Sequence, residues 1–307
     1  MKEVIVTGAG GFIGASLTRK LVFQGWKVHV LVREQSVLWR LKDLQQKIVV
    51  HRGVLEKPKI LSKLMRSLQP RYVYHLATYG AYPSQQDVGK MIKTNIEYTN
   101  VLLKSLIDTR VKAIAVAGSS SEYGKKEKPM RESDMPEPNN FYGSTKAAQT
   151  YLSLVAAKTH SLPIVVLRLF NVYGPYEEKG RLVRSVIESV LAKKEIHLAT
   201  GKEARDLVYV DDVVNAFIHA SQKKVVGGEI FNIGTGRQTT IHSLAKKVIE
   251  LTGISVPIIL GVYPGREWDT YHWKADVTKS QRTLGWKAKY DVEKGLKKTI
   301  LWYRKNL

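Results

Sequence analysis

The chain has 307 residues, with 49 lysines and arginines against 27 aspartates and glutamates, which gives a formal net charge of +22 at pH 7. A chain of this length can bury a large core unaided. Because it contains no cysteine, disulfides, thiolate metal sites and a cysteine nucleophile are excluded. The lack of cysteine and of a signal-peptide pattern leads us to expect a cytoplasmic protein. No apolar run reaches the roughly 18 residues of a spanning helix, so we expect no membrane insertion.

The positive charge has two interpretations. It could bind nucleic acid or an anionic membrane, or it could be a lysine-rich solvated surface that attracts an anionic substrate. The basic residues are spread along the chain, without an arginine-rich arm or an aromatic-basic recognition module. We therefore favour the second interpretation and expect no specific nucleic-acid partner.

Short β-branched runs alternate with longer helical stretches up to about residue 170. The predicted strands span residues 4–6, 28–32, 48–50, 72–76, 114–117 and 164–169. Most of them are nearly continuous apolar runs, which is typical of strands buried on both faces of a parallel sheet. The alternation predicts an α/β protein with a doubly wound, Rossmann-type parallel sheet.

The alternation loosens after residue 171. Residues 195–199, 207–210 and 230–232 have strand character, and helices are expected to start near Asp211 and Thr240. Residues 291–306 predict one amphipathic helix. The sequence thus predicts a smaller C-terminal α/β lobe over residues 171–307, part of which returns to the main sheet.

A glycine-rich segment separates the first predicted strand from the first helix. Residues 7–14 read Thr-Gly-Ala-Gly-Gly-Phe-Ile-Gly. Glycines at 8, 11 and 14 permit a tight turn, a close backbone approach to a pyrophosphate and close helix–strand packing. The helix N-terminus adds amide donors for phosphate. A turn without a ligand is the alternative, but the strand–turn–helix context favours binding. We therefore predict a dinucleotide-binding domain over residues 1–170 and a mainly substrate-binding lobe over 171–307.

The end of the second strand selects the dinucleotide. An acidic residue there binds the ribose 2′-hydroxyl of NAD, whereas an arginine accommodates the 2′-phosphate of NADP. Val32 occupies this place and Arg33 follows it, so we predict NADP. NAD remains the alternative, with Glu34 on the ribose and Arg33 as a surface cation.

A tyrosine and a lysine four residues apart, Tyr142 and Lys146, would share one face of a helix. A phenol has a pKa of about 10, and a nearby ammonium lowers it toward the range that general acid–base catalysis needs. Ser119 and Ser120 follow the fifth strand, where open α/β sheets bind ligands. A serine there could relay a proton to or from a sugar oxygen. The alternatives are an exposed ion pair and a polar turn.

Together these segments resemble the nucleotide-sugar epimerase/dehydratase branch of the extended short-chain dehydrogenase/reductase superfamily. The likeness covers nearly the whole chain. It continues through residues 75–77 (His-Leu-Ala), 94–95 (Thr-Asn), 168–175 (Arg-Leu-Phe-Asn-Val-Tyr-Gly-Pro), 205–212 (Arg-Asp-Leu-Val-Tyr-Val-Asp-Asp), 232–236 (Asn-Ile-Gly-Thr-Gly) and 284–286 (Leu-Gly-Trp).

The resemblance implies a role for each matching residue. Tyr142 would be the general acid/base, assisted by Ser119, while Lys146 would hold the nicotinamide ribose. The implied substrate contacts are Ser120, Asn171, Arg205 and Arg266, with the two arginines facing the diphosphate. The implied cofactor contacts are Gly8, Gly11, Phe12, Ile13, Gly14, Arg33, Leu76, Ala77, Tyr142 and Lys146. The resemblance also implies a homodimer formed through two helices per subunit, and no metal.

Two departures from the family pattern bear on function. The family often has Gly-Asp after the third strand, where this chain has Gly53 and Val54, which puts the adenine contacts in doubt. The dehydratases of the branch carry Thr-Asp-Glu where this chain has Ser119, Ser120 and Ser121. This difference argues against 4,6-dehydration, although Glu122 stands only one position later.

Three functions remain open at this point. The first is NADPH-dependent reduction of a 4-keto-6-deoxy nucleotide sugar, which Arg33 favours. The second is an NAD-dependent nucleotide-sugar 4-epimerase of the UDP-glucose 4-epimerase type. The third is a non-catalytic nucleotide- or RNA-binding protein, which the intact Ser119, Tyr142 and Lys146 set disfavours.

Overall fold

A seven-stranded parallel sheet lies at the centre of the computed structural model, which describes residues 3–223, 227–262 and 270–306. The strand order is β11-β6-β5-β4-β1-β2-β3. The reversal of strand order beside β1 is the doubly wound topology that the sequence predicts, so the predicted fold class is confirmed. The strands are β1 (Glu3–Thr7), β2 (Lys27–Val32), β3 (Ile48–Arg52), β4 (Tyr72–His75), β5 (Ala113–Ser119), β6 (Ile164–Leu169) and β11 (Glu229–Ile233).

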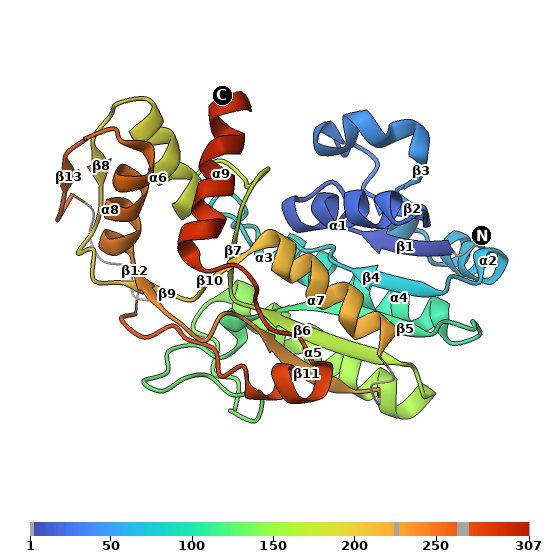
Figure 1. Cartoon of the computed structure of the whole chain (residues 1–307). Helices are drawn as coiled ribbons and strands as arrows, with labels where there is room; N and C mark the ends of the chain where they lie inside the picture. The colour runs from blue at the N-terminus through green and yellow to red at the C-terminus, as the bar shows by residue number, and fades with distance from the viewer. Residues whose placement is uncertain (1–2, 224–226, 263–269, 307) are drawn as a thin grey trace.

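Helices cover both faces of this sheet (Figure 1). Alternate strand residues form two apolar cores, one on each face. One face packs against α1 (Phe12–Phe23) and α7 (Val210–Gln222), and the other against α2 (Pro58–Leu68), α4 (Tyr98–Leu106) and α5 (Phe141–His160). Shorter helical segments link these elements: η1 (Trp39–Lys47), η2 (Val54–Glu56), α3 (Val88–Ile92), η3 (Lys93–Glu97) and η4 (Ser120–Glu122).

The C-terminal lobe lies beside the carboxyl ends of the main strands. Its helices are α6 (Leu182–Leu191), α8 (Ile241–Thr252) and α9 (Val292–Asn306), with η5 (Ser280–Leu284) between the last two. Three pairs of short strands complete it: β7 (Asn171–Tyr173) with β10 (Leu207–Tyr209), β9 (Ala204–Arg205) with β12 (Thr239–Thr240), and β8 (Ile196–His197) with β13 (Ile258–Ile259). The chain returns to the main sheet through β11, which pairs with β6. The domain boundary near residue 170 remains a prediction.

Local capping explains where the helices that matter for the site begin. The side chain of Asn140 accepts a hydrogen bond from the backbone N–H of Gly143 at 2.8 Å, so α5 starts immediately before Tyr142. Thr240 caps α8 in the same way through Ser243, where the sequence predicted a helix start. Within the described part of the chain, no helix is long and apolar enough to cross a membrane.

Candidate active site

A cleft of about 1000 Å³ follows the carboxyl ends of β1, β2, β4, β5 and β6 and is closed on its other side by residues of the C-terminal lobe. Parallel strands direct their carboxyl ends to one edge of the sheet, so residues distant in sequence meet there. Of the residues predicted to act in catalysis, cofactor binding or substrate binding, all but one line this cleft. The exception is Arg266, which lies outside the described residues.

The turn between β1 and α1 leaves no room for side chains. Gly8 has a φ of +68°, and a Cβ built on it would lie 2.6 Å from the backbone of Leu76 and Ala77. A Cβ on Gly14 would lie 2.2 Å from the carbonyl oxygen of Gly8. The backbone here is therefore free to approach a ligand, and the N-terminus of α1 offers amide donors to an anion. This cradle fits the diphosphate of a dinucleotide.

The end of β2 presents no carboxylate to the cleft among the described lining residues. Val32 is buried, while Arg33 and Ser36 line the cleft. Glu34 is absent from the lining residues, and its carboxylate lies beside Gly53, where a built Cβ would come within 2.5 Å of Glu34 Oε2. Arg52 donates to the backbone carbonyls of Glu34 and Ser36, both at 2.9 Å, and so holds this turn in place.

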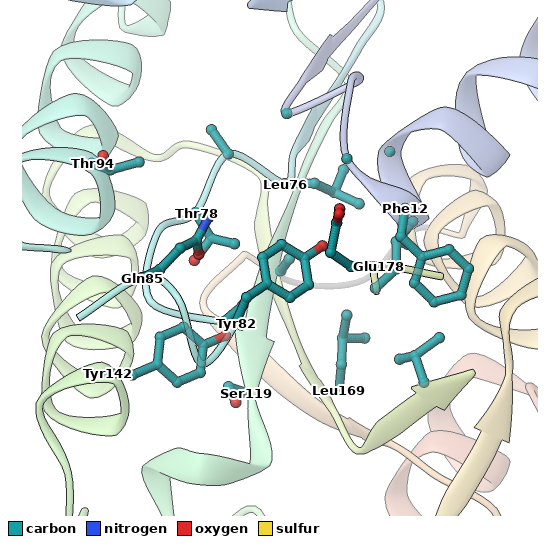
Figure 2. Close-up of a pocket in the computed structure, with 18 of the residues that line it drawn as sticks. Phe12, Leu76, Thr78, Tyr82, Gln85, Thr94, Ser119, Tyr142, Leu169 and Glu178 are labelled. Carbon is teal, nitrogen blue, oxygen red and sulfur yellow. The ribbon is translucent and has the colours of Figure 1, made fainter. Parts of the chain in front are cut away.

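Ser119, Tyr142 and Lys146 all line the cleft (Figure 2 shows the first two). Ser119 ends β5 and caps η4, where its hydroxyl accepts from the N–H of Ser121 at 3.1 Å. Tyr142 is half-buried in the first turn of α5. Lys146 lies one turn further along and is only 1% exposed. The helical spacing therefore brings the pair to one face, as its sequence predicts.

Burial raises the pKa of Tyr142, while a hydrogen bond with Ser119 and the charge of Arg181 oppose that rise. The sequence predicted a lowered pKa for this phenol. The direction is the opposite because desolvation of the phenolate outweighs the favourable contacts in this arrangement.

Burial lowers the pKa of Lys146 to about 8, with the charge of Glu122 opposing the change. The ammonium donates to the carbonyl oxygen of Ala117 at 2.5 Å and to the side-chain oxygen of Gln149. Because an ammonium has three donors, one N–H remains for the cleft. A lysine with this pKa is mostly charged at neutral pH and loses its proton as the pH rises through about 8.

Glu122 points away from the cleft. It is fully buried, forms an ion pair with Arg168 at 2.8 Å and accepts from Thr150 at 2.9 Å. Its other oxygen accepts from the backbone N–H of Ser119 at 2.7 Å. The carboxylate therefore supports the turn that carries Ser119, and it is not placed to protonate a leaving group.

The residues predicted to contact substrate come from both lobes. The buried side-chain oxygen of Asn171 has no hydrogen-bond partner within the described chain, which is unusual for a buried amide. Ser120 accepts a hydrogen bond from the indole N–H of Trp273 at 3.0 Å. The guanidinium of Arg205 lies 5.9 Å from the Trp273 ring centre. The roles assigned to these residues remain predictions.

Several residues that line the cleft could not be predicted from the sequence. Arg40 is buried beside the glycine-rich turn and donates to the carbonyl of Gly10 at 3.2 Å and to Glu178 at 2.8 Å. Tyr82 lies between Tyr142 and Phe12 in the view of Figure 2. No motif announces these residues, since each reaches the cleft through tertiary packing. Arg181 and Trp273 are further lining residues that the sequence did not predict.

The fold and the cleft together define an α/β enzyme built to hold a dinucleotide beside a tyrosine–lysine pair. Residues 4–234 match the model of the NAD-dependent epimerase/dehydratase family. The chain belongs to this family, within the extended short-chain dehydrogenase/reductase branch, so the resemblance seen in the sequence is confirmed.

Similar proteins share the architecture over their whole length. A UDP-N-acetyl-alpha-D-glucosaminuronate decarboxylase of Bacillus cytotoxicus is 30% identical, over 99% of this chain and 98% of its own. The UDP-glucose 4-epimerase of Thermotoga maritima, solved with UDP-glucose, superposes with a TM-score of 0.91 at 33% identity, covering 99% of both chains. The UDP-glucuronic acid 4-epimerase of Bacillus cereus, solved with UDP-glucuronic acid and NAD, gives 0.88 at 25% identity, covering 99% of this chain and all of that one.

Replacing Lys146 with methionine tests the lysine directly. Methionine has similar bulk but carries no charge, so we expect lower activity and weaker dinucleotide binding. The wild type should lose activity as the pH rises through about 8, where Lys146 becomes neutral. The variant lacks that step, and its alkaline limb should move upward to the pKa of Tyr142. A normal pH profile with normal binding would contradict this role.

Proposed function

We propose that the protein catalyses hydride transfer at C4 of a nucleotide-linked sugar, with NADP or NAD as cofactor. The observation that carries the proposal is the meeting of Ser119, Tyr142 and Lys146 with the glycine-rich turn in one cleft. A bound nicotinamide would supply the hydride or accept it. The residues of the chain supply binding and proton transfer, which are the protein's share in such reactions.

In this proposal Tyr142 gives a proton to the sugar oxygen at C4 or takes one from it. The phenol is hydrogen-bonded to Ser119, which would link it to the sugar oxygen. In the proposal the positive charge of Lys146, one helical turn away, favours the phenolate. Reduction of a 4-keto group needs a proton from Tyr142, and oxidation of a 4-hydroxyl returns it. The same residues thus serve both directions.

The nucleotide diphosphate would occupy the part of the cleft near the C-terminal lobe. Arg205 supports this placement because its guanidinium lines the cleft and can pair with phosphate oxygens. Arg266 is proposed as a second cation from its sequence alone. The partnerless oxygen of Asn171 would accept from a substrate hydroxyl, which would remove the cost of leaving it buried and unpaired.

Elimination of water at C5–C6 is disfavoured by the side chains present. Ser120 and Ser121 stand where a dehydratase carries acids, and Glu122 is held in its buried pair with Arg168. The carboxylates among the described lining residues are Glu56 and Glu178, and neither belongs to the segment that carries Ser119. Hydride transfer without dehydration is therefore the better-supported chemistry.

Reduction by NADPH is the first candidate outcome. It is supported by the cleft beside β2, where Arg33 and Ser36 can both contact a 2′-phosphate and Glu34 is turned toward Gly53. A cation and a hydroxyl suit a phosphate, whereas the ribose 2′-hydroxyl of NAD is typically held by a carboxylate.

Epimerisation at C4 is the second candidate outcome, and its support comes from the relatives. The epimerases named above resemble this chain over its whole length. The B. cereus enzyme was solved with NAD. An epimerase regenerates its cofactor in each cycle, whereas a reductase consumes one NADPH for each sugar reduced.

A homodimer is also proposed. One face of α5 exposes Phe141, Tyr151 and Val155, which are 66%, 54% and 61% exposed. These positions fall within one arc of the helix. An apolar helix face of this kind suits burial against the same face of a second copy.

Changing Tyr142 to phenylalanine should reduce turnover by about 10²–10⁴-fold, because the ring still packs while the proton carrier is lost. Dinucleotide binding, measured by titration calorimetry, should stay close to that of the wild type. Activity within a few-fold of the wild type would remove Tyr142 from the reaction.

Arg33 decides the cofactor in this proposal. Arg33→Ala should weaken NADPH binding roughly 10–150-fold, the worth of charge-assisted hydrogen bonds to a phosphate, and leave NADH binding nearly unchanged. Val32→Asp combined with Arg33→Asn should reverse the preference. Both cofactors are titrated against all three proteins at one salt concentration, since screening weakens these contacts. Equal loss of both cofactors in Arg33→Ala would refute the preference for NADP.

Cofactor stoichiometry separates the two candidate reactions. The purified protein is incubated with NADPH and a 4-keto-6-deoxy nucleotide sugar and, separately, with NAD and UDP-glucose, and the absorbance at the reduced nicotinamide band is followed. Loss of one NADPH per sugar identifies a reductase. Interconversion of the 4-epimers without net loss identifies an epimerase.

The dimer prediction is tested by sedimentation velocity. Tyr151→Arg with Val155→Glu places charges on the exposed face of α5 and should produce a monomer that keeps its fold by circular dichroism. A monomeric wild type would exclude this interface.

A further inference from the structure

A chain of buried hydrogen bonds joins the glycine-rich turn to the catalytic lysine. Thr7 Oγ1 lies 2.7 Å from His75 Nδ1, and His75 Nε2 lies 2.8 Å from Thr99 Oγ1. Gln149 Nε2 donates to the same Thr99 oxygen at 2.8 Å, and Gln149 Oε1 accepts from Lys146. The first four residues are fully buried. This series of hydrogen bonds runs from β1 through β4 and α4 to α5.

The direction of every bond in this chain is determined by its neighbours. Thr7 Oγ1 accepts from the backbone N–H groups of Leu76 and Ala77, both at 3.1 Å, so its own proton goes to His75 Nδ1. His75 is therefore neutral, with its proton on Nε2, and it donates to Thr99.

The same reasoning settles the far end of the chain. Thr99 gives its proton to the carbonyl oxygen of Asn95 at 2.8 Å, so its oxygen accepts from both His75 and Gln149. The amide of Gln149 must then turn its oxygen toward Lys146, which can only donate. A flipped amide would lose both contacts.

We propose that Gln149 is a positioning residue for the reaction: backed by Thr99, His75 and Thr7, it holds the Lys146 ammonium in place and keeps it charged. The proposal rests on the proposed function, in which that charge favours the Tyr142 phenolate. This series of hydrogen bonds does not transfer protons, because the amide of Gln149 does not give up a proton at neutral pH. Its effect is electrostatic and geometric.

The groups around Lys146 explain why the side-chain oxygen of Gln149 is important for stabilising its charge. The charge of Glu122 of η4 raises the pKa of Lys146, but this carboxylate is already paired with Arg168. Burial and the charge of Lys146 lower the pKa of His75 to about 3, so this neighbour stays neutral. Tyr142, on the same helix, is neutral below its raised pKa. The carbonyl oxygens of Gln149 and Ala117 are then the nearest stabilising partners of the buried charge.

Two substitutions should move the titration of Lys146 in opposite directions. Gln149→Leu removes the acceptor, and Lys146 should lose its proton about 1–2 pH units lower than in the wild type. Gln149→Glu replaces the acceptor with a carboxylate, and the titration should move upward. Ser153→Ala is the matched control, since Ser153 is also buried on α5 but donates only to the backbone of residue 149. It should leave the titration unchanged.

The titration is followed by NMR on the full chain labelled at the lysine ε carbons, with Lys146→Met to assign the signal. Thermal unfolding verifies that each variant is folded. Opposite shifts in the two variants, with the control unmoved, support the inference, and the alkaline limb of each variant's rate profile should move in the same direction as its Lys146 titration. A titration that is unchanged in both variants, or moves the same way in both, overturns it. If the shifts appear but no nucleotide sugar is turned over, the proposed function fails while the role of Gln149 toward Lys146 stands.

Discussion

The backbone of Gly8 lies so close to the turn after β4 that a single added carbon would fall 2.6 Å from Leu76 and Ala77. This approach decides the shape of the cleft, because it lets the N-terminus of α1 reach the space above the sheet. The hydroxyl of Thr7 holds it in place by accepting from both N–H groups of the turn. The surface that we propose for phosphate binding is thus made by backbone atoms, whose positions the parallel sheet dictates.

Beneath the cleft, the protein buries charges that would be costly alone. Arg168 and Glu122 are nearly inaccessible, and Arg168 also lies 4.5 Å from the centre of the Tyr123 ring. A buried ion pair is poor evidence for stability, since desolvation offsets much of its attraction. Here its consequence is geometric: Glu122 holds the N–H of Ser119 and so fixes where the serine hydroxyl stands.

The parallel sheet could be predicted because β1, β2, β5 and β6 are nearly continuous apolar runs, which are typical of buried parallel strands. The site trio was likewise readable, since helical spacing alone brings Tyr142 to Lys146. The raised pKa of Tyr142 was not readable, because it depends on how much water reaches the phenol. Arg40 and Trp273 were missed for a similar reason: their neighbours in the fold lie far away in sequence.

The seventh strand of the sheet, β11, follows β7, α6, β8, β9 and β10 of the C-terminal lobe in the sequence. The N-terminal portion therefore lacks its own last strand. If it were made alone, β6 would present an unpaired apolar edge, which is the kind of surface that recruits other chains and aggregates. The two lobes are thus interleaved in folding, and a ribosome must release most of the sequence before the nucleotide-binding sheet can be completed.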